Sequence, residues 1–202
     1  MALNYANNQS LSAISALPAS ITGGALTLLE TQTASGSASI NFTSNIDSTY
    51  DKYIFKFINC QPTTNNVVYH FQGSTDGGSN YNVTMTTTYF RAYHYEDDSS
   101  TAFGYVPSLD QAQGTSYQNL ANNMGSGSDE SLSGELILYN PSSTTFVKHF
   151  ISRTSGVNPD STGLMIDTFV AGYFNTTSAI NAMSFKYASG NINGTIKMYG
   201  VS

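Results

Sequence analysis

The side chains that could perform acid–base or metal chemistry in this chain are few. Acidic residues gather at Glu96–Asp98, at Asp129-Glu130 and at Glu135, and a pair of carboxylates is the machinery of glycoside hydrolysis. The first two groups stand in Ser- and Gly-rich segments, where a carboxylate is usually solvated. Their oxygens suit Ca²⁺, but no D-x-D-x-D-G pattern accompanies them. The sequence therefore predicts no catalytic residues and no metal site.

The other reactive side chains are also isolated. His70, His94 and His149 are too far apart in sequence for an HxH or HExxH motif, and no G-x-S-x-G or GxxxxGK[ST] segment is present. The single cysteine, Cys60, excludes an internal disulfide, and its apolar context YIFKFINC predicts a buried, inert thiol. We therefore expect a protein that is not an enzyme and needs no cofactor.

The segment STDGGSNY (Ser74–Tyr81) fits the Asp box found in sialidases: Ser, Asp and Gly at fixed spacing, then an aromatic residue. The box is structural, and a sialidase also requires three arginines, whereas this chain has two, Arg91 and Arg153. The triplet Asp76-Gly77-Gly78 between two alternating runs is also a strong hairpin signal. We therefore predict a hairpin that sets the register between the strands near 66–73 and 80–93.

Alternation of polar and apolar residues marks ten candidate strands. They are rich in β-branched and aromatic residues and are bounded by Gly, Asn, Asp, Ser or Pro. In the clearest, KYIFKFIN, residues Tyr53, Phe55 and Phe57 share one face. The runs are 25–30, 38–43, 52–59, 66–73, 81–93, 134–140, 145–151, 165–174, 180–187 and 194–200. This pattern predicts an all-β fold, an antiparallel β-sandwich of jelly-roll type.

Two segments fall outside this pattern. We predict that residues 1–22 form an N-terminal arm before a β-sandwich domain at 23–202. We also predict a long loop insertion from about 94 to 130. Apolar arm residues recur three to four positions apart, so one face of the arm could dock on a partner or pack on the chain's own sandwich. They are Leu11, Ile14, Leu17 and Ile21.

Aromatic residues concentrate beside the predicted loop. Stacking of sugar rings on such side chains is a common means of glycan binding by Tyr-rich β-sandwiches, and subunit contact or core packing would use the same residues. The candidates for a glycan or subunit surface are Tyr89, Tyr93, Tyr95, Phe103 and Tyr105, with Phe90 among them.

Composition narrows the class of protein. Charged residues make up 10% of the 202 residues and the net charge is −6, compared with about 25% charged residues in an average soluble protein. The seven Lys and Arg are scattered, which argues against nucleic-acid binding. The N-terminus has neither a basic n-region nor a continuous apolar stretch, so we expect no Sec signal and no membrane anchor. A viral structural protein, made in the host cytoplasm and released by lysis, fits this combination.

Several long strings carry a resemblance that spans almost the whole chain. They are NYANNQSLSAISALPASITGGALTLLETQTASGSASINFTSNIDSTYDKYIFKF, FQGSTDGGSNYNVTMTTTYFRAYH, SDESLSGELILYNPSSTTFVKHF and AGYFNTTSAINAMSFKYASGNINGTIKMYG. They resemble the virion structural proteins of tailed phages of marine bacteria, cyanophages especially. The resemblance implies a capsid-decorating or fibre-like component of the virion, and it supplies no catalytic residue.

Together these observations predict a non-enzymatic virion protein. The favoured role is a capsid decoration (cement) protein that bridges subunits of the major capsid protein, as a homo-oligomer with trimeric symmetry. The alternative is a tail-fibre or appendage domain that binds host surface glycan through the aromatic residues. A carbohydrate-active enzyme ranks third.

Overall fold

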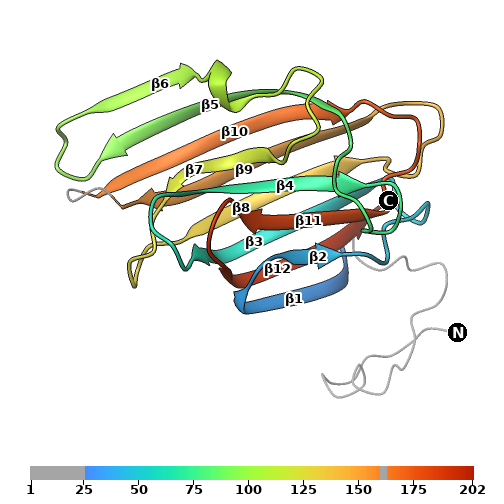
Figure 1. Ribbon diagram of the computed structural model, residues 1–202, viewed down its shortest axis with the longest axis horizontal. Helices are drawn as coiled ribbons and strands as arrows, with labels where there is room; N and C mark the ends of the chain where they lie inside the picture. The colour runs from blue at the N-terminus through green and yellow to red at the C-terminus, as the bar shows by residue number, and fades with distance from the viewer. Residues whose placement is uncertain (1–25, 160–162) are drawn as a thin grey trace, which may run out of the picture.

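The protein is all-β, with two antiparallel sheets packed face to face (Figure 1). The computed structural model describes residues 26–159 and 163–202. A 3-10 turn, η2 (Pro107–Leu109), lies between β6 and β7, and no helix in the described ranges is long and apolar enough to cross a membrane. The strands are β1 (Thr27–Ser37), β2 (Ile40–Phe42), β3 (Lys52–Pro62), β4 (Val67–Ser74), β5 (Met85–Tyr95), β6 (Thr101–Tyr105), β7 (Gln118–Met124), β8 (Leu132–Tyr139), β9 (Lys148–Asn158), β10 (Leu164–Phe174), β11 (Ala182–Tyr187) and β12 (Ile192–Val201).

The two sheets differ in size. The larger has eight strands in the order β1-β12-β3-β8-β9-β10-β5-β6, and the smaller has four in the order β2-β11-β4-β7. Several strands pair with partners far along the chain. β3 pairs with β12 in the larger sheet, β4 with β11 in the smaller sheet, and β5 with β10 in the larger sheet. Each later pair lies, in sequence, between the two strands of the pair named before it. The predicted β-sandwich is confirmed, while its assignment as a jelly roll stays a prediction.

All ten predicted strands are present, with shifted ends. In β3, Tyr53, Phe55 and Phe57 point inward and are at most 2% exposed, as their alternation indicated. β1 and β9 both end seven residues beyond their predicted ends, and β9 continues through a polar run to Asn158. Its inward hydroxyls are satisfied inside the protein, because Ser152 donates to the Glu135 carbonyl and Thr154 donates to the Leu120 carbonyl.

The core between the sheets is centred on Phe185 of β11. Its ring lies 5.2 Å and 5.3 Å from the ring centroids of Phe55 and Phe57 in the larger sheet. It also lies 6.3 Å from those of Phe42 and Phe71 in its own sheet. All five side chains are at most 2% exposed. Aromatic pairs at these separations add to the free energy gained by burying their apolar area, so this cluster holds the two layers together.

The segment predicted as a long loop, residues 94–130, contains two strands instead. β6 extends the larger sheet beyond β5, and β7 forms an edge of the smaller sheet beside β4. Asn is depleted in strands, so the sequence QNLANNM of β7 gave no strand signal. Its Leu120, Ala121 and Met124 are nevertheless buried, at most 2% exposed. Burial against β9 and β10 therefore overrides the local propensity.

The unequal sheets leave part of the larger one uncovered. β7 packs over β9 and β10, and in Figure 1 β5 and β6 run along the top of the view, beyond β7. Near the start of β5, Met85 and Tyr89 are fully buried, while Arg91, Tyr93 and Tyr95 farther along the same inner face are only partly buried. This overhang positions a cleft described below.

We expect Phe185→Ala to lower the free energy of unfolding by roughly 3–5 kcal/mol, since it removes a buried ring and leaves a cavity at the junction of the two sheets. Urea or guanidinium unfolding measures the change. Phe146→Ala is the matched control, because Phe146 is 70% exposed and its loss should change stability by no more than about 0.5 kcal/mol. Similar losses for the two variants would contradict the assignment of Phe185 as the centre of the core.

Candidate functional site

The three histidines lie on separate parts of the fold. His70 stacks on Tyr117 on the solvent side of the smaller sheet, with ring centroids 4.9 Å apart; burial and the nearby Lys186 charge lower the pKa of His70 to about 4. His94 is exposed and lies 3.1 Å from an oxygen of Asp98, and His149 is exposed on β9. Within the described ranges, no group of three or more His, Cys, Asp or Glu residues is placed to hold a metal ion.

Two buried titratable side chains, Cys60 and Lys148, are enclosed by the protein. Cys60 is fully buried, as predicted, and burial raises the pKa of its thiol to about 12, so the reactive thiolate is scarce at neutral pH. Lys148 is also fully buried, and its Nζ donates a hydrogen bond to the Thr176 carbonyl at 3.1 Å. Burial lowers the pKa of Lys148. Neither side chain lines a cavity described below.

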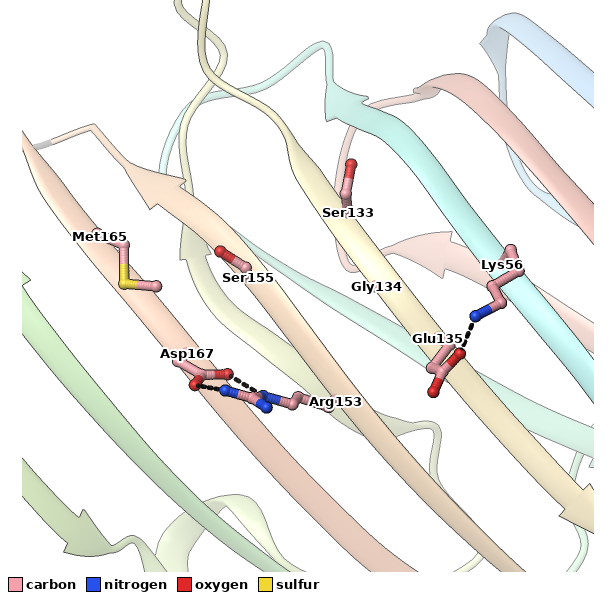
Figure 2. A pocket seen from close by; sticks show the side chains of 8 residues that line it. All are labelled: Lys56, Ser133, Gly134, Glu135, Arg153, Ser155, Met165 and Asp167. Carbon is pink, nitrogen blue, oxygen red and sulfur yellow. Dashed lines mark hydrogen bonds and ion pairs between the residues drawn. The ribbon is translucent and has the colours of Figure 1, made fainter.

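The solvent side of the larger sheet is called the outer face from here on. A shallow depression on this face contains two ion pairs (Figure 2). Lys56 pairs with Glu135 across β3 and β8. Arg153 holds Asp167 with two hydrogen bonds, Nε to Oδ1 at 3.0 Å and Nη2 to Oδ2 at 2.7 Å, and this contact raises the pKa of Arg153. Each carboxylate is thus paired with a base, so the depression offers no free acid pair for catalysis.

The outer face also carries most of the exposed large apolar side chains. Among residues 26–159 and 163–202, strand register places six of the eight such residues on it: Leu28, Ile58, Phe103, Tyr105, Ile151 and Met165. Phe90 and Phe169 stack in parallel at 4.9 Å, Phe103 meets the Phe90 ring edge-on at 5.7 Å, and the Arg153 guanidinium lies 4.7 Å from the Phe169 ring centroid. An aromatic ladder therefore runs across the strands from edge strand β6 to β9.

The aromatic residues predicted to form one surface are divided by the sheet. Tyr89 is fully buried in the core. Phe103 and Tyr105 lie on the outer face, 73% and 54% exposed, opposite Ala92 and Phe90. Tyr93 and Tyr95 point to the inner side. Successive side chains of a strand alternate between the two faces, so the cluster in the sequence cannot form a single patch.

The overhang of β5 creates a second candidate site, a polar cleft between the two sheets. Tyr93, Tyr95 and Arg91 come from the larger sheet, and they face asparagine side chains from the β3–β4 turn and from β7. Sequence reasoning did not single out these asparagines, because segments such as TTNNV are ordinary turn signals. The described residues that line the polar cleft are Asn65, Asn66, Arg91, Tyr93, Tyr95, Asn123, Asn158, Pro159, Leu164 and Ile166.

Residues 74–81 connect the two sheets and do not form the predicted hairpin. β4 pairs with β11 and β7 in the smaller sheet, whereas β5 pairs with β10 and β6 in the larger. The chain therefore crosses from one layer to the other after Ser74. The hairpin prediction was wrong because Asp-Gly-Gly satisfies a tight turn whether or not the flanking strands pair with each other.

The turn chemistry itself is as the sequence indicated. Ser74 Oγ donates to an oxygen of Asp76 at 2.6 Å, and the same carboxylate accepts hydrogen bonds from the backbone and side-chain nitrogens of Asn80 at 2.9 Å and 2.7 Å. Gly77 and Gly78 have φ of +71° and +90°. A Cβ at Gly78 would lie 2.7 Å from the Tyr81 hydroxyl, so the turn requires glycine there.

The predicted docking arm, residues 1–22 with Leu11, Ile14, Leu17 and Ile21, lies outside the described residues. Comparison of the chain with protein-family models, curated proteins and solved structures gave no match. The described part of the chain thus presents two candidate surfaces, the outer face and the polar cleft.

We expect Asp76→Asn to lower stability at pH 7, and the difference from the parent protein to become much smaller as the pH falls toward 2. Hydrogen bonds from Ser74 and Asn80 lower the pKa of Asp76 from 3.8 to about 2 in the fold. The carboxylate therefore stabilises the protein fully above pH 4, and this contribution is lost as the pH falls through the folded pKa. Urea unfolding at pH 7 and at pH 2.5 measures it. Asp129→Asn, in an exposed loop, controls for the lost charge, and an equal deficit at both pH values would contradict the prediction.

Proposed function

We propose that the protein is a non-enzymatic structural component of a tailed-phage virion, and that it docks on the capsid shell as a decoration (cement) protein. The observation that carries this proposal is the outer face, on which six exposed large apolar side chains share one sheet surface. These side chains are spread from edge strand β1 to edge strand β6, and a protein that docked on this whole face would cover all of them. The resemblance of the sequence to virion proteins supports the choice of partner, the major capsid protein.

The charge distribution of the outer face suits a tight protein contact. Lys56 and Arg153 are paired with Glu135 and Asp167 at the centre of the face, so burying this part of the face need not leave those four charges unpaired, which is the costly event in burying ionic groups. Ile151 and Met165, 50% and 43% exposed, lie beside these pairs. Apolar burial around a paired polar centre would then supply the free energy of binding.

The geometry disfavours the carbohydrate-active enzyme. Glycoside hydrolysis uses two carboxyl groups that flank the scissile bond. In the depression of Figure 2, Glu135 and Asp167 each form an ion pair with a basic side chain, and the described residues that line the polar cleft include no Asp or Glu.

The proposal also includes a trimeric assembly on the shell, with the N-terminal arm as a second contact. The protein would then reside in the virion.

The test replaces one apolar residue of the outer face with a charged one. We expect Ile151→Lys to reduce occupancy on particles by about tenfold or more, because docking would have to bury an unpaired ammonium group. Copies per particle are counted by quantitative mass spectrometry or imaging of virions that carry the variant.

Phe146→Lys is the matched control, because this equally apolar side chain is 70% exposed in the loop between β8 and β9. Its occupancy should match that of the parent protein, and both variants should keep the parent's thermal stability. Full occupancy of the Ile151→Lys protein would refute docking through the outer face. A few copies confined to the tail would refute the decoration role.

A further inference from the structure

We propose that the polar cleft beneath the β5 overhang binds a saccharide that carries a carboxylate group. The cleft lies on the opposite side of the larger sheet from the outer face, so this proposal does not depend on where the protein docks. Its volume is about 460 Å³, within the roughly 300–1,000 Å³ typical of small-ligand sites.

Asparagine amides form one wall of the cleft. Each amide offers two N–H donors and a carbonyl acceptor, which is the pairing that neighbouring sugar hydroxyls require, since each hydroxyl both donates and accepts. Asn66 and Asn123 hold left-handed backbone positions, with φ of 59° and 56°, which Asn tolerates better than most residues. The Oδ1 of Asn65 accepts a hydrogen bond from the Ser126 amide at 3.0 Å, so its NH₂ group is oriented and has donors to offer.

Two tyrosines form the opposite wall. The rings of Tyr93 and Tyr95 lie 6.0 Å apart and nearly perpendicular, at 84°, in the edge-to-face arrangement that fixes an aromatic pair. Both side chains are partly buried, so each ring is held by the protein and still presents surface to the cleft. Aromatic rings and amides that line one cleft suit a ring that is apolar on its faces and polar around its edge, as a sugar is.

The guanidinium group of Arg91 selects an acidic sugar. It lies 5.9 Å from the Tyr93 ring centroid, and it is the charged side chain among the described residues that line the cleft. No ion pair of Arg91 occurs within residues 26–159 and 163–202. Arginine has five donors and no acceptor, and its planar fork matches a carboxylate. The cleft therefore offers a guanidinium group that can hold a carboxylate through two hydrogen bonds.

The test measures binding of uronate oligosaccharides to the full chain. Oligogalacturonate, alginate and hyaluronan fragments serve as probes in calorimetry, each as the free acid and as its uncharged methyl ester. We expect the parent protein to bind at least one acid about tenfold more tightly than the ester, as a charge-assisted hydrogen bond implies. Arg91→Gln should weaken binding of the acid to the level of the ester and leave the ester unchanged. Tyr93→Ala should weaken both forms by a similar factor.

Two further variants keep the proposal falsifiable if these substitutions disturb the fold. Asn66→Asp is isosteric and adds a negative charge to the cleft, so it should weaken binding of the acid more than binding of the ester. Tyr105→Ala removes a half-exposed tyrosine from the outer face and should change neither. Failure of the parent to bind any acid in the panel would overturn the proposal, as would equal losses in the Tyr105→Ala and Tyr93→Ala proteins or an acid preference that survives Arg91→Gln.

Discussion

The packing of Phe185 against aromatic rings from both sheets is the interaction on which the rest of the structure depends. The rings of Phe55 and Phe57 project from the larger sheet, and Phe42 and Phe71 stand beside Phe185 in the smaller. A four-stranded layer centred on this cluster cannot cover eight strands. The outer face and the polar cleft both follow, since no strand in the described part of the chain covers one side of the larger sheet and β5 extends past the layer on its other side.

Strand β5 contributes side chains to both surfaces, because its successive side chains point to opposite sides of the sheet. Phe90 points to the outer face, where it stacks on Phe169, while the neighbouring Arg91 points into the polar cleft. The two surfaces have opposite chemistry. The outer face combines exposed apolar side chains with two ion pairs near its centre. The cleft combines amides, tyrosines and a cation, as recognition of a small polar ligand requires. A decoration protein with a saccharide site would thus present the two functions on opposite sides of one sheet.

At residues 74–81, the conformation of the turn depends on neighbouring residues, whereas the pairing of the flanking strands depends on distant ones. Ser74, Asp76 and the two glycines form the hydrogen-bonded turn that their types indicated, because those interactions span only a few residues. Whether the strands on either side pair with each other depends on partners far along the chain: β11 for the first and β10 for the second. The residues of the turn do not indicate which strands pair with each other. The sequence therefore predicted a hairpin where the chain connects the two sheets.

The all-β class, the positions of ten strands and the core-facing side chains of runs such as Tyr53–Phe57 could be predicted from the sequence. Alternation and turn chemistry are local, so they can be recognised without knowing the fold. The strands β6 and β7, the placement of Tyr93 and Tyr105 on opposite faces, and the approach of Arg91 to asparagines of distant segments follow from the three-dimensional packing alone. These features arise from pairing and layer packing, whose free energy comes from contacts between residues far apart in the chain.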